Sequence, residues 1–221
     1  AVVATTGQHR EMLKQMLEDF HLQPDFDLKV MTENQTLFDV TVSAFKRLEK
    51  LYVEVVPDMV FVQGDTTTAF CATLGAFYRR IPVAHVEAGL RSYDIDNPFP
   101  EEANRAMISR LATLHLAATR LGKKNLLKEG IAERFVFVAG NTVVDALLSA
   151  VGQERSFSNK TIGRFLSQWP QCRLALMTAH RRENFGKPLE AICQAARWAA
   201  DRFRDMAIIY PVHLNPNVQR V

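Results

Sequence analysis

DMVFVQGDTTTAFCATLGAFYRRIPVAHVEAG, residues 58–89, is the stretch that decides the fold expected for this chain. Two apolar, β-rich runs, 58–63 and 82–86, predict strands, and the segment 67–79 between them predicts a helix. A strand, a helix and a second strand in this order are typical of a parallel βαβ unit. The stretch therefore predicts an α/β protein with a parallel sheet.

The same alternation continues on both sides of this unit. Further strands are predicted at 2–5, 28–31, 113–118 and 134–138. Further helices are predicted at 9–20, 36–54, 101–111, 120–129 and 142–151. Together these elements predict one doubly wound sheet.

A domain boundary is expected after this series. Residues 152–169 lose apolar density and carry Gly, Ser, Asn and Gln, which indicates a boundary or crossover. A new unit follows, with strands at 172–179 and 206–212 and a helix at 187–203. We expect a first domain at 1–155 and the start of a second at 156–221. Because the chain opens directly in a strand and closes just after one, we expect a piece of a longer α/β protein.

Charge and hydropathy limit the partners that the chain is expected to bind. The net charge of +3 comes from 27 basic and 24 acidic residues that are spread along the chain. The one dense cationic cluster, residues 180–182, is too small for a nucleic-acid surface. No apolar run reaches the roughly 18 residues that cross a bilayer, and the N-terminus lacks the layout of a signal peptide. The expectation is a cytoplasmic protein without a nucleic-acid or membrane partner.

Neither a metal nor a cofactor is expected. Cys71, Cys172 and Cys193 are odd in number and far apart, which argues against a disulfide framework and against CxxC chemistry. The glycine fingerprints of dinucleotide and triphosphate sites are absent, and no His/Cys/Asp set has metal-ligand spacing.

Polar residues follow most of the predicted strands. Ligands of open parallel sheets bind beyond the carboxyl ends of the strands, so these residues are expected at one edge. The candidate carboxyls are Asp65, Glu87 and Glu101, and the His180-Arg181-Arg182 cluster follows a strand of the second domain. Carboxyls supply general acids and bases, and cations hold an anionic leaving group. This pairing favours chemistry on a nucleotide-activated sugar.

Each candidate also has a purely structural interpretation. Asp65, followed by Thr66, could cap the helix that begins at 67. The helix macrodipole favours Glu101 and Glu102 at a helix start whatever their function. Glu87 has no capping partner implied by the sequence.

The cationic cluster and the two strand histidines have alternatives as well. Residues 180–182 could be a solvated loop, although guanidinium groups and free backbone N–H groups also bind diphosphate. His85 and His115 are predicted to be core or edge histidines.

Six ordered motifs give the chain a resemblance to a known family. They are QGDT (63–66), HVEAGLR (85–91), PFPEEANR (98–105), GNTVVDAL (140–147), HRREN (180–184) and YPVHLNP (210–216). They resemble, over essentially the whole chain, the motifs of non-hydrolysing UDP-N-acetylglucosamine 2-epimerases. The resemblance implies a glycosyltransferase-B-like fold of two Rossmann-like domains. The first, at 1–155, would carry the catalytic carboxyls, and the second, which is only partly present at 156–221, would bind the nucleotide. The resemblance also implies a homodimer that converts UDP-GlcNAc to UDP-ManNAc for surface polysaccharides, through elimination of UDP to 2-acetamidoglucal and its re-addition.

The resemblance also implies roles for individual residues. The implied catalytic positions are Asp65, Glu87, Glu101 and His180. The implied positions for substrate acting as an effector are Gln8, Glu11, Glu101, Arg181 and His213, and Glu11 departs from the glutamine of some relatives.

Three other functions stay open: a hydrolysing 2-epimerase that releases ManNAc and UDP, a glycosyltransferase of the same architecture, and a sugar-nucleotide-binding module without turnover. The GTRPE-type turn that precedes the matching region in relatives, and their later Ser-Gly-Gly and Glu motif, are absent. The chain alone is therefore expected to be inactive.

Overall fold

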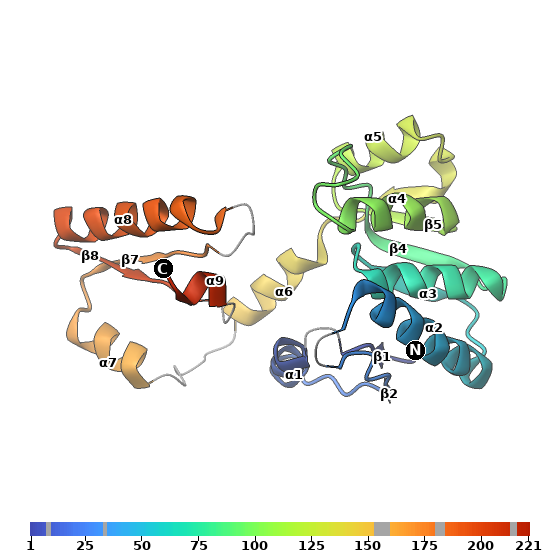
Figure 1. Ribbon diagram of the computed structural model, residues 1–221, viewed down its shortest axis with the longest axis horizontal. Helices are drawn as coiled ribbons and strands as arrows, with labels where there is room; N and C mark the ends of the chain where they lie inside the picture. The colour runs from blue at the N-terminus through green and yellow to red at the C-terminus, as the bar shows by residue number, and fades with distance from the viewer. Residues whose placement is uncertain (8–9, 33–34, 153–159, 180–183, 213–215) are drawn as a thin grey trace. The chain divides into compact units, whose positions relative to one another are not determined.

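The computed structural model describes residues 1–7, 10–32, 35–152, 160–179, 184–212 and 216–221 (Figure 1). The chain divides into two compact units, Ala1–Gly152 and Gln153–Val221. Both units contain parallel sheets and helices, so the predicted α/β class is confirmed. The assignment of catalysis to a domain at 1–155 and of nucleotide binding to one at 156–221 stays a prediction.

The first unit is built on a four-stranded parallel sheet. Its order is β3 (Val60–Gln63), β4 (Val83–Ala88), β5 (Leu114–Ala117) and β6 (Val136–Val138). β3 and β4 are joined by α3 (Thr67–Tyr78), so residues 58–89 form the βαβ unit that the sequence predicts.

A separate pair of parallel strands holds the N-terminal segment. β1 (Ala4–Thr5) pairs with β2 (Phe26–Asp27), and within the described residues no ladder joins them to β3. The single sheet expected from the sequence is therefore wrong. The strand predicted at 28–31 is displaced as well, although the backbone N–H of Leu28 and of Val30 still donates to the carbonyl of Thr5 and of Thr6, respectively.

The helices of the first unit lie close to their predicted positions. They are α1 (Arg10–Asp19), α2 (Leu37–Val55), α3, α4 (Glu101–Leu111), α5 (Arg120–Lys128) and α6 (Thr142–Val151), with a short 3-10 turn at Glu133–Phe135. A capping box fixes the start of α2, because the Thr36 hydroxyl accepts from the Asp39 N–H and the Asp39 carboxylate accepts from the Thr36 N–H.

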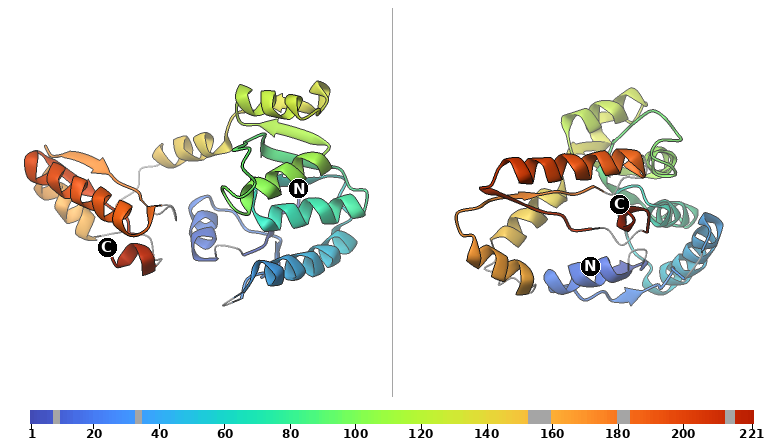
Figure 2. Two further views of the ribbon diagram at one scale, coloured as in Figure 1. Left: turned by 45° about the horizontal axis from the view of Figure 1, so that its top comes forward. Right: turned by 60° about the vertical axis from the view of Figure 1, so that its left-hand side comes forward.

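Two apolar clusters hold the first unit together. α2 and α3, which the larger cluster joins, lie side by side in Figure 2. The larger cluster joins the inward face of α2, including Ala44 and Leu48, to α3, to β3 and β4, and to Ile108 of α4. The smaller cluster consists of Ala88, Ala117, Leu126 and Val136. These clusters cover the central strands, which is why β4 carries three consecutive buried residues, 83–85.

The second unit repeats the βαβ pattern on a smaller scale. β7 (Arg173–Leu176) and β8 (Met206–Ile209) are parallel and are joined by α8 (Lys187–Arg202), which carries Pro188 in its first turn. α9 (Pro216–Gln219) follows β8. α7 (Lys160–Gln168) lies where only a boundary or crossover was expected, because Ile162, Phe165 and Leu166 supply a one-sided apolar stripe despite the polar composition.

None of the helices in the described ranges is long and apolar enough to cross a membrane.

Candidate active site

Asp65 lies in the turn that connects β3 to α3. Gly64, with φ of +72°, turns the chain out of the sheet in a conformation that glycine adopts without strain. The N-cap of α3 is Thr66, whose hydroxyl accepts from the Ala69 N–H at 3.2 Å. The structural interpretation in which Asp65 caps α3 is therefore wrong, and the Asp65 carboxylate can pair with another residue.

The partner of Asp65 comes from α4. Arg105 Nη2 lies 2.7 Å from Asp65 Oδ2, and the two side chains are only 13% and 25% exposed, respectively. Arg105 Nη1 also lies 3.4 Å from Glu102 Oε2, and Asn104 Nδ2 donates to the Asp65 carbonyl at 2.9 Å. The first turns of α4 thus fix both the side chain and the backbone of Asp65.

Opposing influences act on the pKa of Asp65. Burial raises this pKa above its usual value, the Arg105 charge opposes the rise, and the negative charge of Glu101 adds to it. Glu101 therefore lies near enough to Asp65 for the two charges to interact. A carboxyl that is held near a cation but has a raised pKa is suited to exchange protons.

Glu87 reaches the same edge of the sheet from β4. It lies inside the strand, not after it as predicted, at a register shift between Val86 and Ala88. Its φ of +65° is uncommon for a residue with a side chain, and such bulges and outliers occur at functional sites. Glu87 Oε1 accepts from Asn141 Nδ2 at 3.1 Å, and Oε2 would lie 3.8 Å from a Cβ placed on Gly64. The Glu87 carboxyl is therefore a close neighbour of the Asp65 turn.

The second acid of α4, Glu102, has a different environment from Glu101. It is 4% exposed and accepts from the backbone N–H groups of Ser92 and Tyr93, at 3.0 and 3.1 Å. Arg91, whose side chain is 2% exposed, anchors the same loop through Glu129 at 2.6 Å. Glu102 thus holds the loop after β4 against α4, a role beyond the favourable placement of an acid at a helix start.

Sequence reasoning gave no site role to three residues that the structure brings to this edge. They are Asn104, Arg105 and Asn141, which contact Asp65 or Glu87. Arg105 follows Glu101 by one helical turn, a spacing that places both on one face of α4. That spacing was the available signal for Arg105. Asn141 follows the predicted strand at 134–138, which placed it at the same edge, but its contact with Glu87, 54 residues away, could not be predicted from spacing.

The cationic part of the predicted site is not covered by the structure. His180, Arg181, Gln8 and His213 lie outside the described residues, and the side chain of Glu11 in α1 does as well. The described residues bring Asp65, Glu87 and Glu101 to one edge of the four-stranded sheet, and the roles of all these residues stay predictions.

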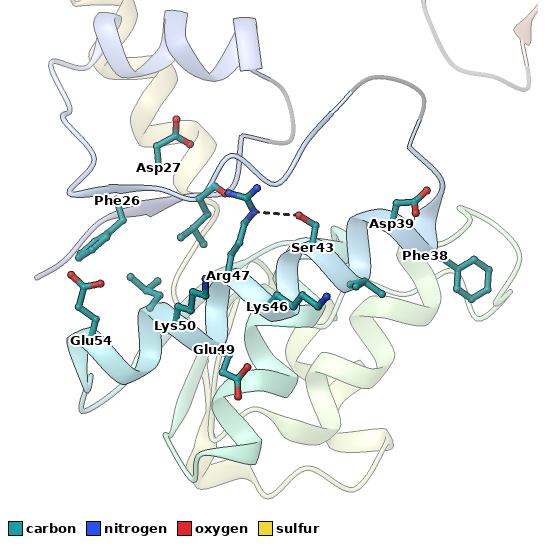
Figure 3. A pocket seen from close by; sticks show the side chains of 13 residues that line it. Phe26, Asp27, Phe38, Asp39, Ser43, Lys46, Arg47, Glu49, Lys50 and Glu54 are labelled. Carbon is teal, nitrogen blue, oxygen red and sulfur yellow. Dashed lines mark hydrogen bonds between the residues drawn. The ribbon is translucent and has the colours of Figure 1, made fainter.

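A groove of about 830 Å³ lies on another part of the first unit, between β2 and α2 (Figure 3). Phe26, Asp27, Lys46, Lys50 and Glu54 are among its lining residues. None of the three candidate carboxyls lines it, so it is not the predicted site. The described residues also contain no group of His, Cys, Asp and Glu side chains that could hold a metal ion.

The parallel βαβ units of the chain, together with its likeness to solved UDP-GlcNAc 2-epimerase structures, give the glycosyltransferase-B-like class expected from the sequence. The chain belongs to the UDP-N-acetylglucosamine 2-epimerase family, whose sequence model matches residues 1–221.

Individual relatives agree with this assignment. A UDP-N-acetylglucosamine 2-epimerase of Bacillus subtilis (strain 168) is 48% identical over 217 residues, which are 98% of this chain and 56% of that protein. The structure of UDP-GlcNAc 2-epimerase from Neisseria meningitidis bound to UDP-GlcNAc has a TM-score of 0.88 at 42% identity, covering 99% of this chain and 60% of that one. S. aureus MnaA with UDP has a TM-score of 0.87 at 43% identity, covering 99% and 56%. The chain thus spans little more than half the length of these relatives.

Proposed function

We propose that this chain supplies the carboxyl groups of an enzyme that interconverts UDP-GlcNAc and UDP-ManNAc by inverting C2 of the sugar. The observation that carries the proposal is the meeting of Asp65, Glu87 and Glu101 at one edge of the sheet. Family membership and the UDP-GlcNAc and UDP bound to the relatives supply the substrate class.

Elimination and re-addition suit this substrate. The C2 proton is not next to a carbonyl, so it is too weakly acidic for simple removal and return. Breaking the C1–O bond to UDP builds positive charge at C1 and acidifies that proton. A carboxylate takes the proton, the C2–H electron pair forms the C1=C2 bond of 2-acetamidoglucal, and UDP leaves with the C1–O electron pair. UDP then re-adds at C1 while a proton is delivered to the opposite face of C2.

The surroundings of the carboxyls suggest a different role for each in the reaction. Asp65 suits proton transfer, because its pKa is raised by burial and it is steadied by Arg105. Glu87, held by Asn141 in a strained backbone conformation, suits a fixed position beside the sugar ring. His180 is assigned to the departing diphosphate, and Gln8, Arg181 and His213 to an effector molecule of substrate.

The cellular setting is part of the same proposal. The enzyme acts in the cytoplasm as a homodimer and needs no cofactor. Its product supplies ManNAc units for the synthesis of surface polysaccharides.

Proton exchange with solvent tests the reaction directly. The chain is assayed alone and as a chimera in which it replaces the matching 217 residues of the Bacillus subtilis relative. With UDP-GlcNAc in deuterated water, NMR should show deuterium entering C2 and UDP-ManNAc accumulating in the chimera. Free ManNAc as the first product would instead identify the hydrolysing reaction. Binding of UDP-GlcNAc without deuterium at C2 would contradict the proposal.

A matched pair of variants ties the reaction to the edge of the sheet. Asp65→Asn should lower the rate about 10²- to 10⁴-fold, the usual contribution of a general acid or base. Asp58→Asn makes the same charge change at an exposed residue before β3 and should leave the rate unchanged. Equal rates for the two variants would remove Asp65 from the mechanism.

A further inference from the structure

His85 is a buried titratable residue that the proposed reaction does not use. Its side chain lies in the middle of β4 and is 1% exposed. Its Nε2 atom lies 2.8 Å from the carbonyl oxygen of Gly64, in the turn between β3 and α3. The imidazole therefore links the centre of the sheet to the residue that precedes Asp65.

The geometry fixes the position of the proton on the ring. A carbonyl oxygen only accepts hydrogen bonds, so Nε2 must carry the proton. Nδ1 is buried and has no hydrogen-bond partner among the described residues, so a second proton there would leave an unsatisfied charge. In agreement, burial lowers the pKa of His85 to about 4. His85 is thus a neutral donor with a single acceptor.

That acceptor belongs to a residue that neighbours two of the three candidate carboxyls. The Gly64 carbonyl begins the peptide unit that leads to Asp65, and a Cβ on Gly64 would lie 3.8 Å from Glu87 Oε2. The Gly64 N–H donates to the Val86 carbonyl at 3.1 Å, directly before Glu87. His85 and this backbone bond hold the Gly64 turn against β4 from two sides. A shift of this turn would change the separation of the Asp65 and Glu87 carboxyls.

The adjacent strand offers a built-in comparison. His115 pairs in register with His85, is also 1% exposed, and leaves the sheet on the same face. Burial lowers the pKa of His115, and the backbone of Ala112, at the end of α4, opposes this change. The two histidines therefore share burial and differ in the backbone segment that acts on each imidazole, the Gly64 turn for His85 and the end of α4 for His115.

We propose that His85 is a positioning residue, which donates its Nε2 proton to the Gly64 carbonyl and thereby sets the separation of the Asp65 and Glu87 carboxyls. This inference rests on the proposed epimerase function for its kinetic consequence. The hydrogen bond itself can be tested without turnover.

NMR of the 221-residue chain labelled with ¹⁵N-histidine and ¹³C tests the hydrogen bond. His85 should carry its proton on Nε2 and show a coupling or shift that depends on the Gly64 carbonyl. His85→Met, which has no donor, should shift the Gly64 carbonyl and Asp65 amide signals, whereas His85→Gln, whose amide donates at similar reach, should restore most of that shift. A proton on Nδ1, or equal shifts in both variants, would overturn the proposal.

Kinetics of the chimera test the consequence for catalysis. His85→Met should lower kcat about 10- to 100-fold, the effect of a small misplacement of reacting groups, with KM changed less than about twofold. His85→Gln should recover most of kcat, and His115→Met should keep kcat even if it destabilises the fold. Equal losses in His85→Met and His85→Gln, or an equal loss in His115→Met, would show a merely structural role. If the unmodified chimera does not turn over UDP-GlcNAc, the proposed function fails, and the NMR measurements alone decide the role of His85.

Discussion

The same βαβ pattern occurs in both units, but β4 of the first unit is mostly buried and β7 of the second unit is mostly exposed. In β4 of the first unit, Val83, Ala84 and His85 are all at most 1% exposed. In β7 of the second unit, Leu174 and Leu176 are 50% and 71% exposed, although β7 and β8 pair in regular parallel register. Further strands on both sides and two apolar clusters cover β4, whereas β7 has one neighbouring strand within the described residues. The pattern of a strand therefore predicts its pairing, and the surrounding elements decide its burial.

This difference bears on where a site can be built. Glu87 with φ of +65° and His85 with an unpartnered Nδ1 are each unfavourable alone, and they persist because the surrounding packing holds them. Within the described residues, β7 and β8 pair only with each other and have less packing around them. The candidate carboxyls of the described chain accordingly lie on the buried sheet.

The largest effect is expected where β4 leaves the sheet. In Gly89→Ala the new Cβ would come 2.2 Å from the Gly122 carbonyl oxygen at φ of +86°, so the turn or α5 must move. We expect a loss in the free energy of unfolding on the order of 4 kcal/mol, by urea denaturation followed with circular dichroism. Gly130→Ala is the control, because Gly130 has φ of +84° with nothing within 4 Å, and it should lose only about 1–2 kcal/mol. Similar losses would show that backbone strain, and not the contact with α5, dominates at Gly89.

A pair of leucine truncations tests the contrast in burial between the units. Leu126→Ala removes a fully buried side chain of the smaller apolar cluster and should destabilise the first unit by about 3 kcal/mol. Leu176→Ala, at the end of β7, should change stability by less than about 0.5 kcal/mol. Trp169 and Trp198 both lie in the second unit, so tryptophan fluorescence reports on that unit separately. A large effect of Leu176→Ala would mean that β7 is covered in solution.

Acid should destabilise the first unit through its buried histidines, His85 above all. Burial lowers the folded-state pKa of His85 to about 4 from an ordinary 6.5, so between these values the unfolded chain binds a proton that the folded chain excludes. The contribution of neutral His85 to the free energy of unfolding is fully present above pH 6.5. It decreases as the pH falls, by about 3 kcal/mol at pH 4. Burial lowers the pKa of His115 in the same direction.

Urea unfolding at a series of pH values checks this dependence. His85→Met should flatten the loss of stability between about pH 6.5 and pH 4, whatever its stability at neutral pH. The described strands of the second unit carry no buried titratable side chain. The unfolding of this unit, followed by tryptophan fluorescence, should therefore lack the loss of stability that His85 causes in the first unit. An unchanged pH dependence in His85→Met would show that folding does not lower the pKa of His85.

The smallest effect is expected at the ion pair of the second unit. Arg173 and Asp205 form a two-point contact at 2.7 and 2.9 Å, yet their side chains are 64% and 63% exposed. Water and salt screen such pairs, so Asp205→Asn should leave the melting temperature nearly unchanged and insensitive to added salt. A clear loss of stability that salt abolishes would show that this pair is an important contact of the second unit.

Much of the fold could be predicted from local patterns. The helices of the first unit and the strands β3 to β6 lie close to their predicted ranges, because apolar periodicity and caps act over a few residues. α7 was not predicted, because its segment is polar in composition and only the spacing of its apolar residues indicates a helix. β2 was predicted at the apolar run 28–31, whereas the residues that pair with β1 precede that run.

By itself, the sequence determined the α/β class, the parallel βαβ units and the set of candidate acids, since these depend on residue type and spacing. The tertiary structure alone decided that Arg105 pairs with Asp65 and that Glu87 lies on a bulge facing Asn141. The physical reason is distance along the chain. These contacts join residues 40 to 54 positions apart, or depend on a register shift between strands, and no local pattern encodes which distant partner a side chain meets.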